Sequence, residues 1–151
     1  MINAYHLTYG DIVKYHGDYF AFLGIHRRYD SKTSELLETY AIYEGAYGIK
    51  AEIEDSSIEE VPLTEELLRE IGFTIYPLSE NCYKAYNGDS AKSNASIYAD
   101  HKGMDLTVTG EDSHGYYDDI HFLHELQEAE RAHGLYNKAN IPWYNLKNRH
   151  F

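Results

Sequence analysis

The chain has 151 residues, which is enough for one ordinary domain or two very small ones. Apolar residues make up 43% of it, close to the average of globular proteins, so the composition excludes disorder over the whole chain. Twenty-five Asp and Glu residues against thirteen Lys and Arg give a formal net charge of −12. Such a charge repels phosphate backbones, so direct binding to nucleic acid is disfavoured.

The single cysteine, Cys82, excludes an internal disulfide and a zinc site built from several cysteines. The first residues lack a basic stretch followed by an apolar run, so no signal peptide is expected. No apolar run approaches the ~18–20 residues that span a bilayer. The sequence therefore predicts a cytoplasmic protein without a membrane partner.

Residues 1–61 have the pattern of a small β module. Apolar runs at 12–15 and 19–25 flank a short turn that contains Gly17, as in a β-hairpin. Further strands are expected at 36–43 and 49–53. Several short strands at this spacing predict an SH3-like β-barrel or a strongly bent sheet.

Residues 62–151 are predicted to form an α+β portion that packs with the barrel, and the fold class of the chain is therefore α+β. A first helix is expected at 65–71, because Thr64 is a good N-cap and Gly72 a good C-terminal residue. An antiparallel meander should follow. Its expected strands are 73–76, 82–86, 96–99 and 106–109.

A second helix is predicted near 119–133. Phe122, Leu126 and Ala129 recur at spacings of four and three, which is typical of one stripe of an amphipathic helix. Asp118 or Asp119 could cap its start.

The second helix carries the most chemically suggestive residues. On a helix, His121 and His124 lie one turn apart, as do His124 and Glu128, so three side chains could bind one metal ion. His124 and Glu125 also begin a pattern similar to the zinc-peptidase helix, with Glu125 as the general base, but that pattern requires a second His where Glu128 stands. The alternative is that these residues form the polar face of an amphipathic helix.

No motif indicates a bound cofactor. Glycine-rich phosphate loops and the Gly-x-Ser-x-Gly nucleophile motif are both missing. The sixteen tyrosines are unusual, and they favour either a sheet with one wet face or a binding surface.

Three stretches, 7–20, 58–73 and 120–127, resemble a family of small uncharacterised proteins of Bacteroides-type gut bacteria, their prophages and mobile elements. The family is similar in its N-terminal β module, its Pro-Leu-Thr-Glu helix ending in Gly-Phe, and its late helix with His-x-Leu-Gln. Glu125 and the additional His121 depart from the family pattern. The resemblance implies this organisation and a phage or mobile-element context, and no catalytic activity.

Three functions remain open at this point. The first is a non-enzymatic accessory module that binds a protein partner and could form homo-oligomers. The second is a metal-dependent hydrolase that uses His121, His124 and Glu128. The third is an acidic decoy that competes for a basic nucleic-acid-binding protein.

Overall fold

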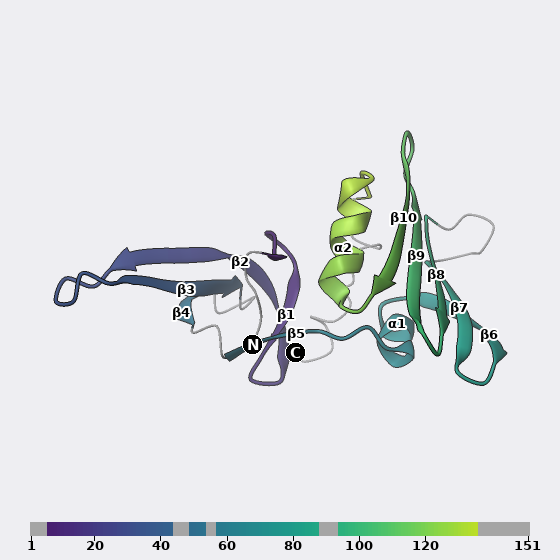
Figure 1. Ribbon diagram of the computed structural model, residues 1–151, viewed down its shortest axis with the longest axis horizontal. Coiled ribbons are helices and arrows are strands. Elements are labelled where there is room, and N and C mark those ends of the chain that lie inside the picture. Colours follow the sequence, from purple (N-terminus) through teal and green to yellow (C-terminus); the bar gives the residue numbers. More distant parts are fainter. Residues whose placement is uncertain (1–5, 44–48, 54–56, 88–93, 136–151) are drawn as a thin grey trace. The chain divides into compact units, whose positions relative to one another are not determined.

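The computed structural model describes residues 6–43, 49–53, 57–87 and 94–135 (Figure 1). The chain divides into two compact units, Met1–Val61 and Pro62–Phe151. Within the described residues, each unit contains one antiparallel sheet of five strands.

The first unit is a sheet in the order β4-β3-β2-β1-β5. His16 and Gly17 form the two-residue turn between β1 and β2, and both have positive φ angles, as hairpin turns of this length require. Ile42 and Ile58 are fully buried in the core of this unit. The strands are β1 (Ile12–Tyr15), β2 (Asp18–Tyr29), β3 (Leu36–Tyr43), β4 (Ile49–Ile53) and β5 (Ile58–Glu60).

The SH3-like barrel expected for residues 1–61 is wrong, because this sheet is open. β4 and β5 lie at opposite edges, and no pairing joins them among the described residues. β2 has twelve residues, more than a small barrel strand needs, and it pairs with β3 as far as Tyr29 and Leu36. The result is the long two-stranded hairpin of β2 and β3 in Figure 1.

The second unit is a meander with strand order β10-β9-β8-β7-β6, accompanied by two short helices. Thr64 caps α1, since its hydroxyl accepts a hydrogen bond of 3.1 Å from the Leu67 amide. The elements are α1 (Glu65–Glu70), β6 (Phe73–Ser79), β7 (Cys82–Asn87), β8 (Ala95–Asp100), β9 (Gly103–Thr109), β10 (His114–Ile120) and α2 (Leu123–Ala132).

Side chains alternate between the two faces of this sheet, as strand geometry requires. One face contributes the buried residues Ala85, Ile97 and Leu106. Leu123 and Leu126 of α2 are also fully buried, and α2 lies alongside β10 in Figure 1. The opposite face of the sheet carries polar and aromatic side chains.

The second helix begins at Leu123 and not near residue 119. Asp119 has a positive φ of 54° and belongs to the end of β10, at an irregularity of the β9–β10 pairing. The Glu125 carboxylate accepts hydrogen bonds of 2.9 Å from the amides of His121 and Phe122, which caps the helix from inside its first turn. Residues 118–120, expected at the helix start, are therefore strand.

The α+β class is also wrong, since the described part of the chain is predominantly β, with two antiparallel sheets and helices of only six and ten residues. Neither of these helices is long and apolar enough to cross a membrane.

Candidate functional site: the open face of the second sheet

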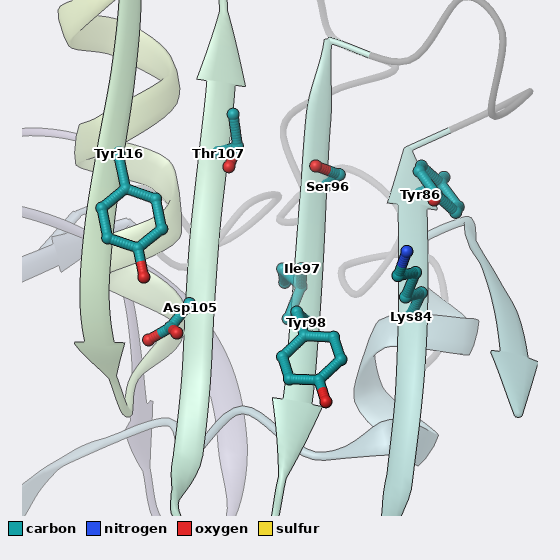
Figure 2. Close-up of a pocket in the computed structure, with 8 residues that line it drawn as sticks. All are labelled: Lys84, Tyr86, Ser96, Ile97, Tyr98, Asp105, Thr107 and Tyr116. Atoms are coloured by element: carbon teal, nitrogen blue, oxygen red, sulfur yellow. The ribbon is translucent and has the colours of Figure 1, made fainter. Parts of the chain in front are cut away.

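Two rows of side chains cross the open face of the second sheet (Figure 2). Each row follows directly paired positions on neighbouring strands, so its members are cross-strand neighbours. The first row consists of Tyr86, Ser96, Thr107 and Tyr116. The second row consists of Tyr76, Lys84, Tyr98 and Asp105.

A hollow of about 310 Å³ lies over these rows. In the first row, the small side chains of Ser96 and Thr107 lie between Tyr86 and Tyr116. They leave space between the two tyrosine rings (Figure 2). The described lining residues of the hollow thus combine aromatic rings and hydroxyl groups with one lysine and one aspartate. Ligand sites have this combination of apolar area with a few placed polar groups.

Asp105 and Tyr116 are linked within the hollow. The Tyr116 hydroxyl donates a hydrogen bond to the Asp105 carboxylate, and this bond raises the pKa of the phenol, with burial and the charges of Asp105 and Asp118 adding to the effect. The amide of Asp119 donates a second bond of 3.2 Å to the same carboxylate. Asp105 is therefore held in place by donors from β10.

Tyr98 is oriented by Cys82. The cysteine Sγ lies 3.5 Å from the Tyr98 hydroxyl, and this hydrogen bond is the main cause that raises the pKa of the Tyr98 phenol. Tyr76 and Tyr86 contact each other edge to face, with ring centroids 5.5 Å apart. The aromatic rings of the face are thus arranged by their neighbours.

The tyrosines of this face remain accessible. Tyr76, Tyr98 and Tyr116 are 44%, 41% and 63% exposed, and the nearby Leu78 is 52% exposed. The sequence pointed to a tyrosine-rich surface without assigning its residues. The strand pattern could have identified these residues, because four of the five strands of the meander place a tyrosine on the open face. These are Tyr76, Tyr86, Tyr98 and Tyr116.

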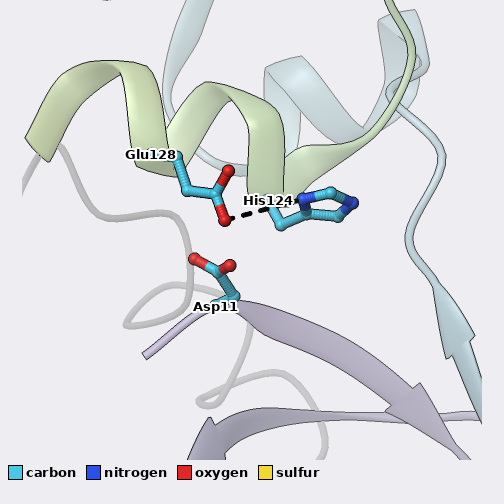
Figure 3. A group of neighbouring side chains, drawn as sticks. All are labelled: Asp11, His124 and Glu128. Atoms are coloured by element: carbon cyan, nitrogen blue, oxygen red, sulfur yellow. Dashed lines mark ion pairs between the residues drawn. The ribbon is translucent and has the colours of Figure 1, made fainter. Parts of the chain in front are cut away.

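The residues proposed as metal ligands lie at the start of α2. His121 precedes the helix, and its Nε2 lies 3.2 Å from an Asp119 carboxylate oxygen. His124 and Glu128 are one helical turn apart, with Nδ1 and Oε1 separated by 4.0 Å (Figure 3). The structure therefore pairs His124 with Glu128 and places His121 with Asp119.

A metal site needs at least three convergent ligands. Within the described residues of the second unit, no three His, Cys, Asp or Glu side chains bring their ligand atoms within 4.8 Å of one another. Asp11, also drawn in Figure 3, belongs to the first unit, where its carboxylate accepts a hydrogen bond of 2.9 Å from the Thr8 amide. The predicted site at His121, His124 and Glu128 stays a prediction.

A second cluster joins the end of α2 to the β9–β10 hairpin. His133 Nδ1 lies 2.7 Å from the Ser113 hydroxyl, and its Nε2 lies 2.9 Å from the Tyr117 hydroxyl. A serine hydrolase also places a hydroxyl on an imidazole, but a carboxylate usually orients that imidazole. Here a phenol occupies the third place, and both ring nitrogens bind hydroxyl groups that fasten the helix to the hairpin.

The chain matches no protein-family model, no curated protein and no solved structure. The functional interpretation therefore depends on the geometry of the open face itself.

Proposed function

We propose that the chain is a non-enzymatic binding module, and that the open face of its second sheet binds a segment of a protein partner. The observation that carries the proposal is that Tyr86, Tyr98 and Tyr116, from β7, β8 and β10, line one hollow on the same face of the sheet.

Tyrosine suits such a surface for physical reasons. Its ring offers a large contact area with only two side-chain torsions to immobilise, and its hydroxyl forms hydrogen bonds at the rim. Tyrosine is accordingly enriched among the residues that contribute most to binding energy in protein interfaces. Strands hold these rings more rigidly than loops would, which lowers the entropy lost on binding.

The charge of the chain also supports a protein ligand. A net charge of −12 opposes a phosphate backbone and favours a partner with basic surface. The phage or mobile-element context belongs to the same proposal and rests on the resemblance of stretches 7–20, 58–73 and 120–127.

The test compares two double variants as bait in a lysate of the source organism. Tyr98→Thr with Tyr116→Thr removes two rings from the face, and threonine keeps the strand propensity. Tyr9→Thr with Tyr29→Thr is the matched control, because these tyrosines are 75% and 74% exposed and lie in the first unit.

A partner that binds the native chain and the control, and is lost from the Tyr98/Tyr116 variant, supports the proposal. Equal capture by both double variants would contradict it. Sedimentation of the same proteins tests for self-association: a homo-oligomer that only the Tyr98/Tyr116 variant abolishes would make a second copy the partner.

A further inference from the structure

The hollow has an acidic end and a basic end. Asp105 lines it next to Tyr116, and the charge of Asp118 is close enough to contribute to the raised pKa of the Tyr116 phenol. Lys84 provides the only positive charge among the described residues of the lining. Two strand spacings separate Lys84 from Asp105, or about 10 Å along the row.

The acidic end offers two kinds of attraction to a cation. Tyr98 and Asp105 are directly paired across β8 and β9, so a group resting on the ring also lies beside the carboxylate. Tyrosine rings attract ammonium and guanidinium groups through their negative faces. A carboxylate adds a charge-assisted hydrogen bond, and arginine can form two such bonds in parallel.

Asp105 keeps capacity for such a ligand. A carboxylate has about four lone-pair positions. Among the described residues, its donors are the Asp119 amide and the Tyr116 hydroxyl. Because both donors come from β10, they hold the carboxylate in position while leaving other lone pairs for a partner.

We infer that the protein partner inserts an arginine or lysine side chain between Tyr98 and Tyr116, against Asp105. This inference rests on the proposed function and specifies the chemistry that the face recognises. The net charge of −12 attracts a basic segment towards the chain, and the Asp105 end of the hollow fixes where its cation is bound.

Lys84 determines which way round a bound segment lies in the hollow. Its ammonium group repels a second cation at the other end of the row, so a single basic side chain fits better than a continuous basic run. A basic residue followed by an acidic or neutral one, about 10 Å further along an extended segment, would match both ends.

The test measures binding of labelled peptides to the full chain by fluorescence anisotropy at about 150 mM salt, where interactions beyond ~8 Å are screened. The probes are a glycine- and serine-flanked peptide with a single Arg-Gly-Gly-Glu unit, in which the acidic residue lies about 10 Å from the arginine when extended, the same peptide with citrulline in place of arginine, and a neutral glucose oligosaccharide. We expect the arginine peptide to bind at least about tenfold more tightly than the citrulline peptide, from the loss of one charge-assisted pair.

Two variants that each remove one negative charge distinguish the effect of Asp105 on peptide binding from the effect of the net charge. Asp105→Asn keeps the shape of the side chain, and we expect it to weaken binding of the arginine peptide by about tenfold. Asp112→Asn lies on the exposed tip of the β9–β10 hairpin and should change affinity less than about twofold. Equal effects of the two variants would overturn the inference.

The outcomes also separate this inference from the proposed function. A native partner that requires Tyr98 and Tyr116 but ignores Asp105→Asn would refute the bound cation and leave the binding face in place. A partner that ignores all three substitutions would refute both. Tyrosine-dependent binding of the oligosaccharide with no preference for arginine would replace the protein segment with a sugar ligand.

Discussion

Tyr98 and Asp105 face each other across the β8–β9 pair on the open side of the second sheet. Neither residue is on a loop, so their separation is set by the hydrogen-bonded register of two neighbouring strands. Tyr116 completes the arrangement from β10 through its hydrogen bond to Asp105. An aromatic ring and a carboxylate are thus preorganised side by side, which is the structural basis of the proposed binding face.

The pKa of the Tyr116 phenol should depend on its hydrogen bond to Asp105. The carboxylate raises the pKa of this phenol above its usual value of 10.0. In the Asp105→Asn variant the hydrogen bond to a charged acceptor disappears, so the pKa of Tyr116 should fall towards that value. Carbon-13 NMR of the labelled phenol carbons measures it, with Asp112→Asn as the control of equal charge. An unchanged Tyr116 pKa in Asp105→Asn would show that the bond is not formed.

Glu130 should lower stability at neutral pH. It is 1% exposed, and neither of its carboxylate oxygens has a hydrogen-bond partner among the described residues. Burial raises its pKa from 4.5 to about 8, despite an opposing effect of Arg131. Because the folded chain keeps this proton and the unfolded chain loses it, stability should fall as the pH rises from about 4.5 to 8. At pH 7 the cost is about 3 kcal/mol.

Replacement of Glu130 by methionine should remove this cost. Glu130→Met should be more stable than the native chain at pH 7–8 and equal to it, or nearly so, below pH 4.5. Amide exchange of β8 and β9 at several pH values measures the stability of the second unit. Glu80→Met, at an exposed position, is the matched control. If Glu130→Met destabilised the unit at pH 8, the carboxylate would have a favourable partner that this account does not include.

Gly115 should be intolerant of a side chain because of His133. A Cβ at Gly115 would collide with the His133 imidazole, which is held by Ser113 and Tyr117. Gly115→Ala should therefore cost about 1–3 kcal/mol of unfolding free energy. In a His133→Ala background the same substitution should cost much less, and denaturant unfolding of the four proteins gives the coupling. Equal costs in both backgrounds would place the strain elsewhere.

Metal analysis tests the alternative based on α2. We expect less than about one-tenth of an equivalent of zinc, manganese or iron in protein purified without a metal-affinity tag, because the described residues bring His124 to Glu128 but place His121 with Asp119. His124→Ala should leave the metal content unchanged. One equivalent of metal in the native protein that His124→Ala removes would favour the metal-dependent hydrolase.

Local signals in the sequence were sufficient for the first helix and for four of the five strands of the meander, but not for β10. Thr64 and Gly72 bracket α1 within a few residues, so nothing distant is needed to place it. The turns between strands are equally local. Asp100, for example, accepts a hydrogen bond of 2.8 Å from the Lys102 amide and closes the β8–β9 turn.

Features that depend on pairing between strands could not be predicted from local signals. Asp118 and Asp119 resemble helix caps, but the pairing of β10 with β9 makes this segment strand and moves the helix start to Leu123. A sheet closes into a barrel only if its two edge strands pair with each other, and the spacing of strands along the sequence does not specify this pairing. The grouping of Tyr98, Asp105 and Tyr116 depends on the register of three strands, which explains why the sequence indicated a tyrosine-rich surface but no site.

The binding face is tested most directly by NMR titration of the full chain with the arginine peptide. Because the two faces of the sheet alternate along each strand, side-chain resonances distinguish them. We expect the ring resonances of Tyr98 and Tyr116 to shift in proportion to the bound fraction, while those of the buried Leu106 and Leu126 do not shift. Shifts confined to other tyrosines, such as Tyr9 and Tyr29, would contradict the claim that this face binds the partner.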